Sequence, residues 1–113
     1  MLITKNAAHK KENGNTCTVW EYDFKKQEVG FSCAQINGRY PATGRVVNMA
    51  CDLIYFVVSG SCVIHIENQV IELKQHDAFF LERNKEYFVV GDQAMLTLVE
   101  SPRWTFGQVR QLT

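Results

Sequence analysis

The sequence of 113 residues has no long apolar run and no excess of charge of either sign. Its longest unbroken apolar run extends from Leu53 to Val58, far short of the ~20 residues that a membrane-spanning helix needs. Twelve Lys and Arg residues balance twelve Asp and Glu residues, so no basic surface is available to neutralise nucleic-acid phosphates. The N-terminal residues MLITKNAAHKKENGN lack the apolar core of a signal peptide. These absences predict a cytoplasmic protein that binds neither membrane nor nucleic acid.

The four cysteines form neither a CxxC nor a CxxH motif, which excludes a zinc knuckle and a thioredoxin-type redox site. In a secreted domain they could form two disulfides, in any of three pairings. Without an export signal, we interpret them instead as reduced thiols buried among apolar neighbours.

The chain does have many apolar residues, 46% of the total, in short runs between regularly spaced turn signals. Asn37-Gly38, Ser59-Gly60-Ser61 and Gly91-Asp92 are examples of such signals. Runs rich in Val, Ile, Tyr, Phe and Thr at this spacing predict an all-β antiparallel sandwich or barrel. The run 53–58 does not alternate, so we expect both its faces to be covered. We predict one barrel domain at 16–103, a flexible N-terminal arm at 1–15 and a C-terminal arm at 104–113.

The stretch DLIYFVVSG, from Asp52 to Gly60, and the following SCVIHIENQVIELKQHDAFFLERNKEYFVVG resemble the small single-domain cupins. The resemblance implies a cupin-type antiparallel β-barrel or jelly roll, also called a double-stranded β-helix. It also identifies the positions at which such barrels usually hold a metal ion. Anchored on Gly60, the position of the metal-binding Glu is Leu53, and the His of the second motif is Tyr87. The paired-His positions are Val47 and Met49, or Val46 and Asn48 in the longer-spaced form.

These substitutions imply a cupin barrel without its metal, because a metal site needs three or four well-matched donors. The three histidines do not replace the missing ligands. His9 lies in the polar arm, His76 in a turn, and His65 on a strand face that we interpret as outward. The sequence therefore predicts no metal site and no cofactor.

A metal-free cupin barrel would still contain a central cavity, whose inward positions follow from strand alternation. If Leu53 points inward, so does Tyr55, and Tyr87 would face them from another strand. Asn48 and Tyr40 would lie near the same mouth, with Trp104 folding back over it. Alternatively, the tyrosines only fill the core and bond to the backbone. The candidate ligand-binding residues are Tyr40, Asn48, Leu53, Tyr55, Tyr87 and Trp104.

The main functional hypothesis is a metal-independent cupin barrel that binds a small, partly polar molecule in its cavity. One alternative is a metal-free enzyme, isomerase-like or epimerase-like, acting on a sugar or small carbonyl compound. Another is a ligand-free dimeric interaction module. A binding protein is favoured over an enzyme because Glu86 and Tyr87 are adjacent on a strand and cannot converge, and because the run 82–86 is typical of a solvated turn. The resemblance and the two arms predict a homodimer.

Overall fold

The computed structural model describes residues 1–112, which form an almost entirely β structure. Thr113, the last residue of the predicted C-terminal arm, lies outside the described residues. No helix in the described part of the chain is long and apolar enough to span a membrane. A short 3-10 turn at Lys5–Ala7 precedes the strands β1 (His9–Asn13), β2 (Cys17–Tyr22), β3 (Gly30–Tyr40), β4 (Arg45–Asn48), β5 (Asp52–Ile66), β6 (Gln69–Leu73), β7 (Ala78–Leu81), β8 (Glu86–Ser101) and β9 (Val109–Leu112).

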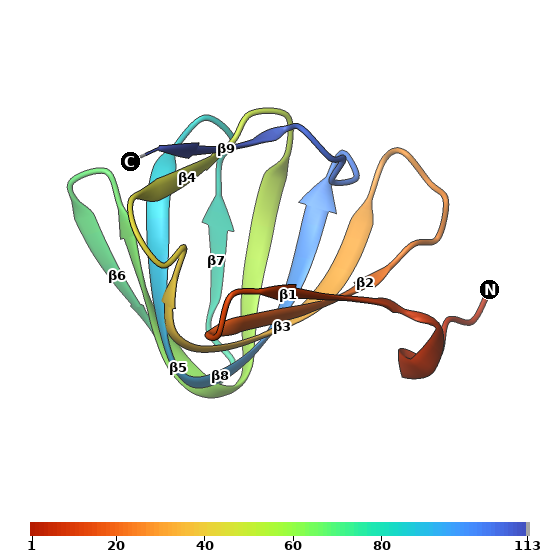
Figure 1. Ribbon diagram of the computed structural model, residues 1–113, viewed down its shortest axis with the longest axis horizontal. Coiled ribbons are helices and arrows are strands. Elements are labelled where there is room, and N and C mark those ends of the chain that lie inside the picture. Colours follow the sequence, from red (N-terminus) through yellow and green to blue (C-terminus); the bar gives the residue numbers. More distant parts are fainter. Residues whose placement is uncertain (113) are drawn as a thin grey trace.

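The strands form one antiparallel sheet that curls into a half-barrel (Figure 1). Along the main path the order is β1-β2-β3-β8-β4-β9, and β5 pairs with β6, β7 and β8. The long strand β8 therefore lies between β3 and β5, which carry much of the inner surface. This architecture confirms the predicted all-β class and the antiparallel barrel.

Glycines mark a corner at which β3, β8 and β5 bend. Gly38 and Gly91 are opposite each other in the β3–β8 register, next to an irregularity after Ile36. A Cβ on Gly91 would collide with the backbone carbonyl of Ile36, and one on Gly60 with that of Gln93. Three predicted turns, at 37–38, 59–61 and 91–92, are therefore wrong, because these segments lie inside long strands. Their glycines supply the bulges and close approaches that a curled sheet needs.

The core occupies the concave side of the sheet. Leu53, Tyr55 and Val57 on β5 point inward and are buried. The expectation that both faces of this segment are covered is wrong, because Ile54 and Val58 on the outer face are 40% and 39% exposed. The apolar run thus follows ordinary strand alternation, with apolar residues also placed on the outer, half-exposed side.

Both predicted arms contain strands. In the N-terminal arm, all five residues of β1 pair with β2. In the C-terminal arm, β9 pairs with β4. The sequence HKKEN of β1 has no apolar alternation, so hydrophobic patterning could not reveal it. Two lysines instead approach an aromatic ring of β2: Lys10 Nζ of β1 lies 6.0 Å from the Trp20 ring centroid, and Lys5 Nζ, from the 3-10 turn before β1, lies 4.8 Å from it. Such cation–π contacts, together with backbone pairing, hold a polar edge strand in place.

Candidate functional site

A cavity of about 420 Å³ opens inside the curled sheet. Side chains from β1 to β5, from β8 and from the segment leading into β9 line it. Asn48, Leu53, Tyr55 and Tyr87 are buried in its wall, whereas Tyr40 and Trp104 are half-buried. The structure therefore brings all six predicted ligand-binding residues together: Tyr40, Asn48, Leu53, Tyr55, Tyr87 and Trp104.

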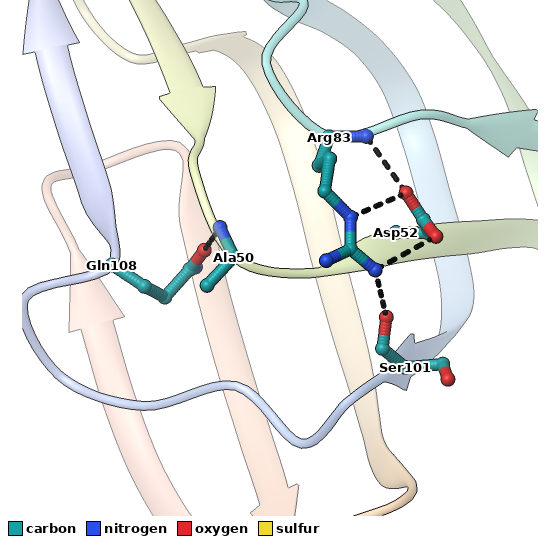
Figure 2. Close-up of polar contacts among 5 residues, drawn as sticks. All are labelled: Ala50, Asp52, Arg83, Ser101 and Gln108. Carbon is teal, nitrogen blue, oxygen red and sulfur yellow. Dashed lines mark hydrogen bonds and ion pairs between the residues drawn. The ribbon is translucent and has the colours of Figure 1, made fainter.

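A chain of buried hydrogen bonds forms the polar floor of this cavity. Gln108 Nε2 donates to Asn48 Oδ1 at 2.9 Å, and Asn48 Nδ2 donates to the Tyr87 hydroxyl at 3.2 Å. Tyr55 donates to the same hydroxyl at 3.4 Å. Gln108 is itself fixed, because its Oε1 accepts the N–H of Ala50 at 3.1 Å (Figure 2). Since the Tyr87 oxygen accepts both bonds, its own proton remains available for a further hydrogen bond.

The phenols on this floor are held in their neutral form. Burial raises the pKa of Tyr55 well above its ordinary value, and the neighbouring Tyr87 raises it further. Burial also raises the pKa of Tyr87, against the opposing effect of the hydrogen bonds from Tyr55 and Asn48. The pKa of Tyr40 is raised by the same desolvation. These groups therefore act as hydrogen-bonding hydroxyls rather than as phenolate bases.

Glu100, near the end of β8, is a buried carboxyl in the cavity wall that the sequence analysis missed. It is 8% exposed, and its Oε1 accepts a hydrogen bond from Ser32 Oγ at 3.2 Å. Burial raises the pKa of Glu100 from 4.5 to about 6, the Ser32 bond opposes that shift, and Glu21 adds to it. A carboxyl with such a pKa exchanges its proton near neutral pH. Strand alternation could have identified Glu100, because it continues the inward face that Leu96 and Leu98 form on the same strand.

A glycine on the neighbouring strand makes room for this carboxyl. Gly30 on β3 lies directly opposite Glu100, and Leu53 on β5 lies opposite it on the other side. A Cβ on Gly30 would collide with Glu100 Oε2. The pairing of a glycine with a buried carboxyl thus shapes this end of the cavity.

Arg83 clamps the strand ends next to Glu100 and Leu53. Its backbone N–H and Nε donate to Asp52 Oδ1 at 2.9 and 3.2 Å, and its Nη2 donates to Asp52 Oδ2 at 3.1 Å (Figure 2). Nη2 also lies 3.4 Å from the carbonyl oxygen of Ser101. These bonds lower the pKa of Asp52. The predicted solvated turn at 82–86 therefore also carries a residue that joins the start of β5 to the end of β8.

Aromatic and charged residues frame the mouth. Lys11 Nζ lies 5.0 Å from the centroid of the Trp104 ring, which lines the cavity. Arg103 forms an ion pair with Asp23 at 3.0 Å and bonds through its backbone N–H to the carbonyl of Gln27. The segment after β8 is thereby fixed to the loop that follows β2.

The residues at the cupin metal positions do not fit a metal ion. Asn48, Leu53 and Tyr87 lie in the cavity wall where the resemblance placed ligands, but together they offer only weak donors. Within residues 1–112, no group of three His, Cys, Asp or Glu side chains could hold a metal ion. His9 lies on β1, His76 lies in the turn after β6, and His65 stacks on Phe88 with 4.3 Å between ring centroids.

No protein-family model matches the sequence, and no curated protein matches it either. Solved structures do match. Pac13, described as a nucleoside dehydratase, superimposes with a TM-score of 0.89 at 13% identity, covering 99% of this chain and 90% of that one. A Streptomyces Pac13 variant with uridine gives a TM-score of 0.90 at 13% identity, covering 99% and 89%.

Two further solved structures match with a lower TM-score or cover a smaller share of the matched protein. KdgF from Halomonas sp. gives a TM-score of 0.75 at 17% identity, covering 92% of this chain and 96% of that one. Oxalate decarboxylase from Bacillus subtilis gives 0.81 at 10% identity, with 97% of this chain matching 31% of the larger protein. All three proteins have the cupin fold. The half-barrel described above is therefore a cupin fold, as the resemblance of residues 52–91 predicted.

Proposed function

We propose that the protein binds a small, partly polar molecule in its barrel cavity, without the help of a metal ion. One observation carries this proposal: the buried Tyr87 hydroxyl lines the cavity and accepts two hydrogen bonds, which leaves its own proton available for a ligand. A group oriented by its neighbours loses little entropy when it binds a ligand. The cavity volume of about 420 Å³ lies in the range of small-molecule sites, roughly 300–1,000 Å³.

The lining favours a ligand that combines neutral polar groups with an apolar part. Tyr55, Tyr87 and Asn48 present uncharged hydroxyl and amide groups, while Leu53 and Leu98 supply apolar surface. The likeness to Pac13, solved with uridine, supports a ligand of about nucleoside size. Uridine is therefore a suitable first probe.

A thermal-shift screen against nucleosides, sugars, organic acids and aromatic compounds tests the proposal. A ligand at 100 times its Kd stabilises the folded state by about 2.7 kcal/mol. Tyr87→Phe should weaken the binding of any hit about fivefold or more. Thr97→Val, which removes a hydroxyl from the outer face of the same strand, is the control. No stabilisation by any compound, or equal affinity of the Tyr87→Phe variant, would overturn the proposal.

Metal independence has its own test. Protein purified without an affinity tag should contain far less than one equivalent of metal by elemental analysis. Dialysis against a chelator should leave both the Tm and the ligand affinity unchanged. Stoichiometric metal, lost together with ligand binding, would refute this part of the proposal.

A metal-free enzyme is the second candidate, isomerase-like or epimerase-like and acting on a sugar or small carbonyl compound. Glu100 favours it, because a carboxyl with a pKa of about 6 suits general acid–base catalysis near neutral pH. Incubation with a metabolite mixture should then deplete one compound, and Glu100→Gln should stop the depletion. Unchanged turnover by the variant would remove Glu100 from any such reaction.

We also propose that the chain forms a homodimer through the outer face of β5 and β7. Ile54 and Phe80 are register partners on this face and are 40% and 56% exposed. The edge strand β1 is less suitable for pairing, because Lys10 and Lys11 place like charges along it. Sedimentation analysis should give twice the monomer mass for the wild type and the monomer mass for Phe80→Ser. A monomeric wild type would refute the dimer.

A further inference from the structure

The Glu100–Ser32 pair lies in the cavity but takes no part in the hydrogen bonds of Tyr55 and Tyr87, which we call the tyrosine floor. Ser32 Oγ donates to Glu100 Oε1, and both residues are buried. Within residues 1–112, none of the ion pairs includes Glu100. A buried carboxyl without a cationic partner is costly unless its oxygens find hydrogen-bond donors. The site therefore has unused capacity to accept hydrogen bonds.

We propose that Glu100 and Ser32 recognise a pair of adjacent hydroxyl groups, such as those of a pentose ring, on a ligand that also contacts the tyrosine floor. This inference rests on the proposed function, since it names the ligand class for the same cavity. A carboxylate accepts about four hydrogen bonds. Ser32 and the backbone of Trp104 supply two donors, which leaves about two positions for a diol.

The distance along the sheet suits such a ligand. Leu53 on β5 is opposite Glu100 on β8, and Tyr55 is opposite Leu98, so all four side chains share the inner face. Glu100 and the Tyr55 position are diagonal neighbours, about 7–8 Å apart across the sheet. A molecule with a pentose at one end and a polar ring at the other can span the carboxyl and the phenols.

Among the described residues, no cation near Glu100 pairs with its carboxylate, so the carboxylate can accept hydrogen bonds from a neutral ligand. Glu21 on β2 lies opposite Ser32 and disfavours ionisation, and Cys51 is a further neighbour. Lys11 on β1 lies over Trp104, while Arg103 is paired with Asp23. Neither cation therefore neutralises the carboxylate.

Isothermal titration with uridine and 2′,3′-dideoxyuridine tests the assignment. At about pH 7.5 uridine should bind at least about tenfold more tightly, because hydrogen bonds to a charged acceptor are strong. The affinity for uridine should fall about tenfold at about pH 5, as the carboxyl takes up its proton. Glu100→Gln should remove both effects, whereas the exposed control Glu72→Gln should keep them. Ser32→Ala provides a second variant, for which the midpoint of the pH profile should move upward.

The possible results distinguish the diol assignment from the proposed function. Equal binding of the two nucleosides, or an unchanged preference in Glu100→Gln, overturns the diol assignment. If uridine binding depends on Tyr87 but not on Glu100, the proposed function stands and the diol site falls. If neither nucleoside binds the wild type, the diol assignment is overturned, and the wider ligand screen decides the function separately.

Discussion

Replacing Glu100 by Gln should stabilise the protein at neutral pH. The folded structure raises the pKa of this carboxyl from 4.5 to about 6, chiefly by burial. The folded state therefore holds the proton more tightly than the unfolded state does, and its stability falls as the pH rises from 4.5 through 6. At 1.36 kcal/mol per pH unit, the full cost above that window is about 2 kcal/mol. A neutral amide avoids the cost and can still accept the Ser32 bond.

Urea unfolding of the wild type and Glu100→Gln at several pH values measures this effect. The variant should be more stable by up to about 2 kcal/mol at about pH 7.5, or about 6–10 °C in Tm. The advantage should shrink as the pH falls through the window and vanish near pH 4. The exposed control Glu72→Gln should show no such trend. A variant that is less stable than the wild type at neutral pH would mean that the carboxylate is better satisfied than its burial indicates.

Three further predictions concern the cavity wall and the thiols. Tyr87→Phe leaves two buried donors without their acceptor, so urea unfolding should show a loss of about 1–3 kcal/mol, and an unchanged midpoint would show that water replaces the hydroxyl. Gly30→Ala should cost about 1–3 kcal/mol, because its Cβ meets the Glu100 carboxyl; a neutral effect would mean that the carboxyl moves aside freely. Burial raises the pKa of Cys17, Cys51 and Cys62 to about 11, so these thiols should react with Ellman's reagent only after unfolding, and rapid labelling of the native protein would contradict this.

The cupin motif and strand alternation together identified four residues of the cavity wall. The motif supplied Leu53, Tyr87 and Asn48, and alternation from Leu53 added Tyr55. These positions were predictable because a side-chain period of two depends only on local backbone geometry. All-β class and barrel architecture followed from the same regularity.

Other parts of the site depend on contacts between distant segments. Gln108, in the predicted C-terminal arm, is buried because it bonds to Asn48 across 60 residues. Glu100 lies one residue before the end of β8, and no motif in the sequence points to it. The room for its carboxyl comes from Gly30 on another strand. Single-sequence patterns contain no information on which strands become neighbours, so these partners could not be identified.

The long separation between bonded residues also bears on how the protein folds. Ser32 and Glu100 are 68 residues apart, and Asn48 and Tyr87 are 39 apart. Such distant partners meet only after the loops between them have closed, and chains dominated by non-local pairing fold in milliseconds to seconds. We therefore expect the cavity to form late in folding. A ligand that needs both ends of it will bind after the rate-limiting step, and will slow unfolding without accelerating folding.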